Sequence, residues 1–409
     1  MTSADSSDGA HRAFGRLWTR DYVLVLLINL TNVLVFYVLT SAVALYSVRE
    51  LGASPAQAGI ASGVFILGEL LGRFVTGALL DRIGRRRALL AGLVFFGLLA
   101  FAYIPVRDLT LFIAVRVAHG IAYGIAGTAV GAAVQVLIPP PRRAEGTGWF
   151  ATTNTLATAI GPMAAILMLG SGGAPLMFAV AGSLVAVAIV CALLARAPGD
   201  APDPAARGTR LRGHHLVEPA ALPMAVIIFL VGGIYLGVVT FLGPFAADVG
   251  LVEAAGWFFI AYAVAIVLVR PVVGPLQDRR GDNVVVIPAL VVFAAGMVLL
   301  ATASSTAHFL AAAAVIGAGY GVTMSATLAI AVAESPPQRV GLANSTYYLG
   351  LTGGMGVAPI VVGALVDVSG YRTTFLVLAG VLLAALVVYL GVHGRKRRGP
   401  HNRPHARRP

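Results

Sequence analysis

Twelve long apolar segments follow one another along this chain, separated by short stretches that carry most of its charges. The segments begin near Tyr22, Ala56, Ala88, Thr110, Thr147 and Ala174, and then near Ala221, Ala254, Asn283, His308, Gly341 and Arg372. Each is about 20 residues or longer, which is enough to cross a hydrocarbon core of about 30 Å as an α-helix. Only helices and closed barrels satisfy their backbone in lipid, and these segments are too long for barrel strands. The pattern therefore predicts an all-α integral membrane protein with 12 transmembrane helices.

Composition and charge fit the same class. The chain is 58% hydrophobic and 11% charged, whereas a soluble domain has about 25% charged residues. With the N-terminus in the cytoplasm, the inner segments hold 23 of the 29 basic residues, as expected when positive loops stay inside. We therefore expect a multi-pass protein of the cytoplasmic membrane with both termini cytoplasmic. The net charge of +12 indicates anionic lipid as a partner, and nucleic acid is not needed to explain it.

The first six segments repeat in the second six at an offset of 197 residues. The offset aligns identical residues, among them Arg73 with Arg270, Gly77 with Gly274, Asp81 with Asp278, Arg82 with Arg279, Gly84 with Gly281, Tyr123 with Tyr320 and Pro162 with Pro359. Two similar halves in an apolar chain are typical of transporters, whose substrate site lies near mid-bilayer between the halves. Transport is therefore the first functional hypothesis.

The repeat predicts five parts. They are an N-terminal cytoplasmic segment 1–21, a six-helix bundle 22–196, a cytoplasmic linker 197–220, a second six-helix bundle 221–393 and a basic tail 394–409. Prolines, glycines and arginines mark the linker. The tail histidines His401 and His405 are expected to belong to a solvated basic segment and not to a metal site. The single Cys191, in an apolar helix, indicates packing and excludes a disulfide within the chain.

Each half carries the same kind of loop between its second and third segments. The loops are GALLDRIGRRR at 77–87 and GPLQDRRG at 274–281. They resemble the signature loop of the major facilitator superfamily, G-x-x-x-D-R-x-G-R-[RK], and the resemblance extends over residues 20–393. It implies two pseudo-symmetric six-helix bundles, usually in a monomer, that rock around a midplane site. It also implies a conformational latch formed by Gly77, Asp81, Arg82, Gly84, Arg85, Gly274, Asp278, Arg279 and Gly281. The second copy departs from the pattern, because Asp282 stands where the first has Arg85.

Two further patterns resemble the 12-helix proton-coupled branch that exports drugs and other small molecules. The run from Arg116 through His119 to Gly120 looks like the R-x-x-[QH]-G element of that branch, whose Arg is linked to proton transfer. Gly148, Gly161 and Pro162 match part of the exporter pattern G-x8-G-x3-G-P-x2-G-G. The match is incomplete, since Ala157, Ala165 and Ile166 replace three glycines, and uptake therefore stays open.

Glu69 is the acidic residue predicted to lie deepest in the membrane. It stands twelve residues before Asp81, about 18 Å along a helix, where an ionised carboxylate is costly. Arg73, at i+4, is the expected partner. One interpretation is that Glu69 takes up and releases the coupling proton. The alternative is a structural Glu69–Arg73 pair that never changes protonation.

The fourth segment carries a polar stripe and a small-residue face. Arg116, His119 and Tyr123 lie at i, i+3 and i+7 and are expected to face the cavity, with His119 either a proton carrier or a buried hydrogen-bonding residue. Gly120 and Gly124 are expected to pack against a neighbouring helix. The other candidates for the cavity lining are Asn29, Asn32, Phe36, Asn154, Tyr235, Tyr320, Asn344 and Tyr347. Together they predict a mixed aromatic and polar pocket for an amphiphilic, cationic compound.

The sequence thus predicts a secondary transporter that exports a small organic compound or drug in exchange for protons. The alternative is a proton symporter or uniporter for uptake of a small solute. The chain has no Walker A motif and none of the motifs H-E-x-x-H or G-x-S-x-G, so we expect neither ATP as the energy source nor an enzyme. No cofactor or metal is expected, and the partners are the substrate, protons and membrane lipid.

Overall fold

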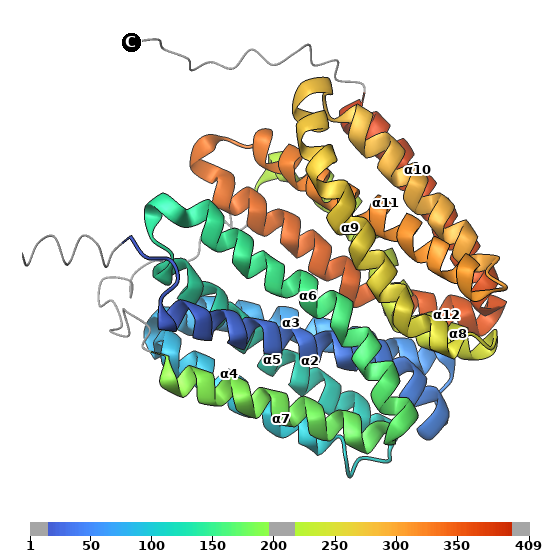
Figure 1. Ribbon diagram of the computed structural model, residues 1–409, viewed down its shortest axis with the longest axis horizontal. Coiled ribbons are helices and arrows are strands. Elements are labelled where there is room, and N and C mark those ends of the chain that lie inside the picture. Colours follow the sequence, from blue (N-terminus) through green and yellow to red (C-terminus); the bar gives the residue numbers. More distant parts are fainter. Residues whose placement is uncertain (1–14, 196–216, 395–409) are drawn as a thin grey trace, which may run out of the picture. The chain divides into compact units, whose positions relative to one another are not determined.

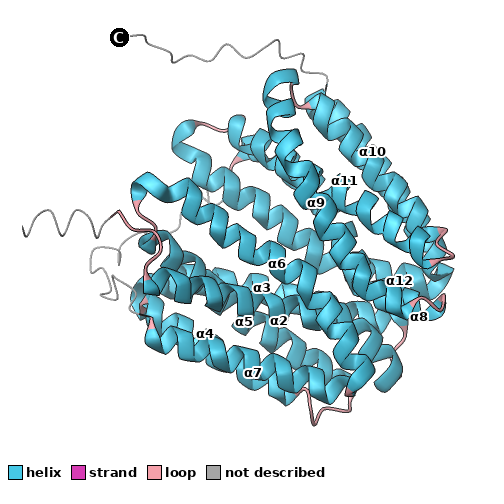
Figure 2. Ribbon diagram, viewed as in Figure 1, coloured by secondary structure: helices cyan, strands magenta, loops and turns pink. Residues whose placement is uncertain are grey.

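The computed structural model describes residues 15–195 and 217–394, and in these ranges every long element is a helix (Figure 2). Contacts divide the described residues into two compact units, one made of 15–195 with 239–244 and the other of 217–238 with 245–394. Most of the predicted linker and tail lies outside the described residues.

Six long helices form the first unit, coloured blue to green in Figure 1. They are α2 (Arg20–Glu50), α3 (Pro55–Ile83), α4 (Arg85–Ala102), α5 (Leu109–Leu137), α6 (Arg143–Ser171) and α7 (Gly173–Leu194). A short 3-10 turn at Pro140–Arg142 precedes α6. Each helix begins within a few residues of its predicted start.

The second unit repeats this order. Its helices are α8 (Leu222–Asp248), α9 (Val252–Arg280), α10 (Asn283–Ala301), α11 (Thr306–Ala333) and α12 (Val340–Tyr389), with 3-10 turns at Pro219–Ala221 and Pro337–Arg339 and a π-helical end at Leu390–Gly394. In α12, Gly370 has φ 76°, so this element consists of two helices joined across a kink. The predicted all-α fold with 12 helices is confirmed.

Membrane crossing follows from length and composition. Ten helical stretches among the described residues are long and apolar enough to span a bilayer. α12, which contains two helices, counts once among them, and α4 is not included. The first turn of α4 carries Arg85, Arg86 and Arg87. The three arginines place charge at the end of an otherwise apolar helix, as expected for a segment anchored at the membrane surface.

The repeat extends to backbone geometry. Gly84 and Gly281 both begin a turn with φ near 90° (88° and 87°), at the same offset of 197 residues. The helix caps repeat as well, because Asp108 accepts a hydrogen bond from the Leu111 N–H at 2.8 Å and Ser305 accepts one from the His308 N–H at 3.3 Å. A positive φ without strain requires glycine, and a side-chain cap satisfies the first turn of α5 or α11. The same local chemistry therefore starts α5 and α11 and forms the turn that precedes α4 and α10.

Close helix contacts depend on glycine at matching places. A Cβ on Gly120 of α5 would overlap the carbonyl oxygen of Phe65 on α3, and a Cβ on Gly317 of α11 would overlap the carbonyl oxygen of Tyr262 on α9. Small residues allow this approach of two backbones. The helix pairs α3 with α5 and α9 with α11 are thus in direct backbone contact at matching places in the two units.

Candidate functional site

A buried carboxylate lies in the middle of the α3–α5 contact. Glu69 is 5% exposed, and its Oε1 accepts hydrogen bonds from Arg73 Nε at 2.9 Å and Arg73 Nη2 at 2.5 Å. The Glu69 side chain is 7% exposed and that of Arg73 is 47% exposed. The i+4 pair expected from the sequence is therefore formed. The Glu69 side chain is enclosed, whereas the Arg73 side chain is half-exposed.

Two glycines of α5 fix the backbone of Glu69. A Cβ on Gly120 would come within 3.0 Å of the Glu69 nitrogen, and a Cβ on Gly124 would overlap the Glu69 carbonyl oxygen. The neighbouring atoms belong to the backbone, which cannot move aside as a flexible side chain can. α5 therefore packs directly against this turn of α3. The carboxylate consequently sits on one of the most closely packed parts of the unit.

Arg116, also on α5, is fully buried. Its Nε donates to the carbonyl oxygen of Ala61 at 2.9 Å, and its guanidinium carbon lies 4.4 Å from the centre of the Phe65 ring. Nη1 and Nη2 make no hydrogen bond to the described residues. A buried cation without a carboxylate partner costs several kcal/mol, and the ring face offsets about 2 kcal/mol of this cost. Packing alone does not account for an arginine here.

His119 is enclosed by aromatic rings. Its ring stacks on Phe96 with centroids 4.4 Å apart and meets Phe65 edge-on at 5.4 Å. Nδ1 shares a hydrogen bond of 3.0 Å with the Tyr103 hydroxyl. Tyr123 continues the same stripe and stacks on Phe36 at 5.3 Å. The polar stripe of α5 thus faces an aromatic cluster within the first unit, and the surroundings of His119 favour a packing role.

That packing role gives a prediction. In His119→Phe the ring that stacks on Phe96 is kept, and only the hydrogen bond to Tyr103 is lost, which costs about 1 kcal/mol. We therefore expect folded protein and transport within about twofold of the wild type, measured as initial substrate flux in proteoliposomes. Tyr103→Phe, which removes the same hydrogen bond from the other side, is the matched control. Loss of flux in His119→Phe alone would assign the imidazole a functional part.

The second unit contains the same helix pair without these ionisable groups. At the offset of 197, Ile266 replaces Glu69, Ala313 replaces Arg116 and Ile316 replaces His119. Gly321, the counterpart of Gly124, still packs on Ile266, and a Cβ there would lie 2.8 Å from its side chain. The fold of a unit therefore does not need the carboxylate, the guanidinium or the imidazole at these places.

The cavity candidates are mostly engaged inside their own unit. Asn29 Nδ2 donates to Thr153 Oγ1 at 2.7 Å and to Asn154 Oδ1 at 2.8 Å, which links α2 to α6. Asn32 is 1% exposed, and its Oδ1 makes no hydrogen bond to the described residues. Gly161 supports the same contact, because a Cβ there would lie 2.6 Å from that of Tyr37 on α2. Pro162 is buried beside it, whereas exposed Gly148 would meet nothing within 4 Å.

In the second unit three tyrosines stack. Tyr235 of α8 lies over Tyr320 of α11 at 4.2 Å and over Tyr262 of α9 at 5.4 Å. The hydroxyl of Tyr347 donates to the Met324 carbonyl at 2.7 Å and lies 2.9 Å from Thr327 Oγ1. Asn344 is exposed. A pocket shared by the two halves remains a prediction.

The signature loops are described only in part. The side chains of 77–83 lie outside the described residues, and with them Gly77, Asp81 and Arg82. Arg85 is half-buried at the start of α4. In the second copy Gly274, Asp278 and Arg279 are exposed, so the latch remains a prediction.

Sequence reasoning missed two buried polar groups in the second unit. Glu218 is 3% exposed, and its Oε2 lies 3.0 Å from Arg339 Nε, so Glu69 is not alone among buried carboxylates. Glu218 precedes α8 at an end of the unit, which is why chain position did not reveal its burial. The other group is centred on His393, which contacts Asp282 and Glu334.

Comparisons with known proteins agree with this architecture. The family model described as Major Facilitator Superfamily matches residues 25–254 and 245–409. A relative from Methanocaldococcus jannaschii, called an uncharacterized MFS-type transporter, is 23% identical over 334 residues, covering 80% of this chain and 86% of that protein. A probable nitrate/nitrite transporter of Mycobacterium tuberculosis is 28% identical over 369 residues, covering 85% and 90%.

Two further matches bear on part of the chain or on the fold alone. A multidrug resistance protein of Serratia proteamaculans is 33% identical over 141 residues, which is 34% of this chain and 33% of that protein. Among solved structures, a bacterial homolog of the human lysosomal transporter Spinster superposes with a TM-score of 0.74 at 16% identity, covering 90% of this chain and 95% of that one. This likeness concerns the arrangement of helices and carries no substrate.

Proposed function

Because the chain belongs to the Major Facilitator Superfamily, and is therefore a multi-pass membrane transporter and not an enzyme, we propose that it exports a small organic compound in exchange for protons. The proposal places it in the cytoplasmic membrane with both termini in the cytoplasm, as the distribution of arginines favours. Proton flow inward would then supply the free energy for export.

The observation that carries the proposal is Glu69. It is a buried carboxylate paired with a half-exposed arginine. It lies on the closest helix contact of the first unit, and its counterpart Ile266 indicates that this contact needs no carboxylate. A charge kept in an apolar helix without a packing reason is a functional candidate. We assign Glu69 the coupling proton.

The chemistry of the pair gives a mechanism. Ionised Glu69 is held by two hydrogen bonds from Arg73 to one oxygen. Protonation makes the carboxyl neutral, removes the attraction between the charges and frees the guanidinium, since a bond to a charged acceptor is stronger than one to a neutral acceptor. The two protonation states therefore differ in how Arg73 is held, and this difference is what a transporter needs in order to link proton uptake to a change of access.

Aromatic side chains and one relative favour a particular substrate class. The aromatic groups around Tyr123 and around Tyr235 offer ring faces, which suit amphiphilic cations. The Serratia multidrug resistance protein matches over about a third of this chain. We propose a lipophilic organic compound, with drug resistance as the physiological outcome.

Uptake is the second candidate function. It is favoured by the Mycobacterium tuberculosis relative, named as a probable nitrate/nitrite transporter, which matches over most of both chains. In this case the protein would be a symporter or a uniporter for a small solute. The basic side chains of Arg73 and Arg116 would then be candidates for contact with an anionic substrate.

The test is a flux assay on purified protein in liposomes that hold a pH-sensitive dye. The panel contains lipophilic cations, zwitterionic compounds and nitrate. Export coupled to protons predicts that an outward-acting substrate gradient moves protons in the opposite direction. Proton movement in the same direction as nitrate would establish uptake by symport in its place, and substrate movement without proton movement would establish a uniporter.

A further inference from the structure

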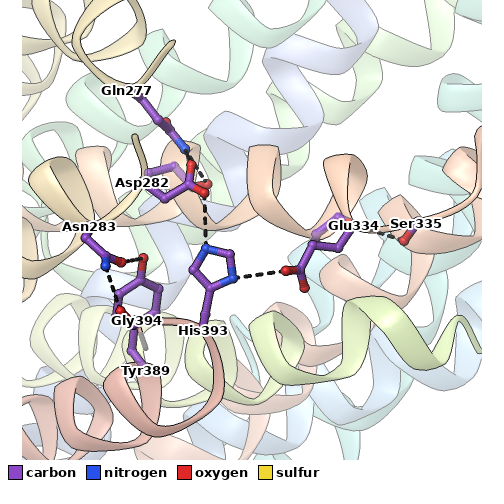
Figure 3. Close-up of polar contacts among 10 residues, drawn as sticks. Gln277, Asp282, Asn283, Glu334, Ser335, Tyr389, His393 and Gly394 are labelled. Atoms are coloured by element: carbon purple, nitrogen blue, oxygen red, sulfur yellow. Dashed lines mark hydrogen bonds and ion pairs between the residues drawn. The ribbon is translucent and has the colours of Figure 1, made fainter. Parts of the chain in front are cut away.

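One histidine lies where three helix ends of the second unit meet. His393, in the π-helical end of α12, is 4% exposed. Its Nε2 lies 3.1 Å from Asp282 Oδ2, at the junction of α9 and α10, and its Nδ1 lies 3.1 Å from Glu334 Oε1, at the end of α11. Figure 3 shows the ring between the two carboxylates. The three residues come from positions 282, 334 and 393 and meet only in the folded chain.

The two contacts together require an extra proton. A neutral imidazole carries one N–H and can donate to one carboxylate only, while its other nitrogen presents a lone pair. Two ionised carboxylates accept hydrogen bonds and donate none. Both contacts at 3.1 Å are hydrogen bonds only when both ring nitrogens carry hydrogen. The geometry thus matches the imidazolium form between Asp282 and Glu334.

The surroundings hold the cluster in place. Gln277 Nε2 donates to Asp282 Oδ1 at 2.9 Å and lies 3.2 Å from the Ala326 carbonyl oxygen, so that carboxylate is oriented from α9. Asn283 links the start of α10 to α12, because its Nδ2 donates to the Gly394 carbonyl at 2.8 Å and its Oδ1 accepts from the Tyr389 hydroxyl at 2.8 Å.

The charges that face His393 are predominantly negative. Asp282 and Glu334 contact it directly, and the Tyr389 ring lies 5.5 Å away with its hydroxyl turned to Asn283. Close to these residues along the chain, the described part also carries the exposed Asp278, Arg279 and Arg280 on the last turn of α9, and Arg339 after α11, which pairs with Glu218. The two carboxylates, both half-buried, are therefore the charged groups in direct contact with the ring among the described residues.

The first unit has a simpler version of this connection between helix ends. At the offset of 197, Arg86 stands in place of Asn283 and donates to the Leu193 carbonyl at 3.1 Å, at the end of α7. Arg85 and Leu137 stand in place of Asp282 and Glu334. Both units thus fasten the start of their third helix to the end of their sixth, but the carboxylate pair exists in the second unit only. The departure of Asp282 from the signature loop is explained by its contact with His393.

We propose that His393, with Asp282 and Glu334, is a proton-binding site of the second unit that is separate from the transport pair. With the proton bound, the imidazolium joins the α9–α10 junction, the end of α11 and the end of α12. When the proton leaves, one carboxylate loses its hydrogen bond, and the three ends are held less tightly. The site makes this end of the unit responsive to pH on the side of the membrane where the C-terminus lies.

Histidine NMR of the full-length protein in detergent tests the site directly. The protein is labelled at the imidazole Cε1 and Nε2 atoms, and the His393 signal is assigned from its absence in His393→Gln. We expect the imidazolium signal near pH 7, because both ring nitrogens then donate, one to each carboxylate. In Asp282→Asn and in Glu334→Gln the signal is expected to become neutral at lower pH. A neutral His393 tautomer from about pH 5 upwards would overturn the proposal.

Thermal stability gives a second readout. If the folded state holds the proton more tightly than the unfolded state, the stability it provides is present at low pH and is lost as pH rises. We expect the melting temperature of the wild type to exceed that of His393→Gln by about 2 °C or more near pH 6 and to match it near pH 9. His308→Gln, at the start of α11, is the matched control and should show no such trend. A difference between wild type and His393→Gln that stays constant with pH would show a merely structural role.

Discussion

Replacing Glu69 by Gln is expected to abolish proton exchange coupled to substrate while leaving the protein folded. Gln has nearly the same shape and can still accept a hydrogen bond from Arg73, but it cannot take up or release a proton. In liposomes with an internal pH dye, the substrate-driven pH change should fall to the background of empty liposomes. Substrate movement down its own gradient can persist, because the fold and the rest of the site are intact.

A matched variant separates coupling from structure. Ile266 occupies the equivalent place in the second unit, so Glu69→Ile carries a side chain that this helix contact accommodates. We expect Glu69→Ile to fold, because the second unit carries Ile266 and Arg270 at the same two positions. Its melting temperature should be lower than that of the wild type, since Arg73 loses its carboxylate partner. Proton exchange that survives in both variants would remove Glu69 from the mechanism and leave its pair with Arg73 as structural.

The comparison between the two units carries more weight than either unit alone. Both keep the glycine contacts, the positive-φ glycines and the caps of α5 and α11, so these features are what the fold requires. Glu69 and Arg116 are replaced by Ile266 and Ala313 in the second unit, and the carboxylates around His393 are replaced by Arg85 and Leu137 in the first. The fold of a unit therefore does not require these charges. We propose that transport or its control is the reason why they are kept.

Much of the fold could be predicted from the sequence, because it follows from local physical rules. A run of apolar residues long enough to cross lipid has to be helical, and the repeat at 197 residues fixes how many such helices there are. The Glu69–Arg73 pair was also predictable, since both residues lie on one helix face at i+4.

Contacts between distant parts of the chain were not predictable in this way. The hydrogen bond between His119 and Tyr103 depends on how α4 ends against α5, and the surroundings of His393 depend on three helix ends that meet in space. Glu218 was assigned to a loop, yet its partner Arg339 lies more than a hundred residues away and is matched to it only by folding. A pattern along the chain contains no signal for such pairs.

The largest structural effect is expected at Gly120. In Gly120→Ala the new Cβ would overlap the Phe65 carbonyl oxygen, and the nearest neighbours are backbone atoms, so α3 and α5 have to move apart. Overpacking of this kind costs about 1–3 kcal/mol, and it also displaces Glu69, whose nitrogen faces the same Cβ. We expect a lower melting temperature and reduced flux, measured by thermal unfolding in detergent and by transport in liposomes.

Gly148→Ala is the matched control, because it makes the same chemical change in a helix where nothing lies within 4 Å of the new Cβ. There the gain in helix propensity, up to about 1 kcal/mol, is not opposed by any overlap, so the melting temperature should stay the same or rise. The two substitutions thus have opposite expected signs. Equal changes in melting temperature in the two variants would mean that the α3–α5 contact is looser than its geometry indicates. A loss of both melting temperature and flux in Gly120→Ala alone would show that this backbone contact holds the carboxylate in place.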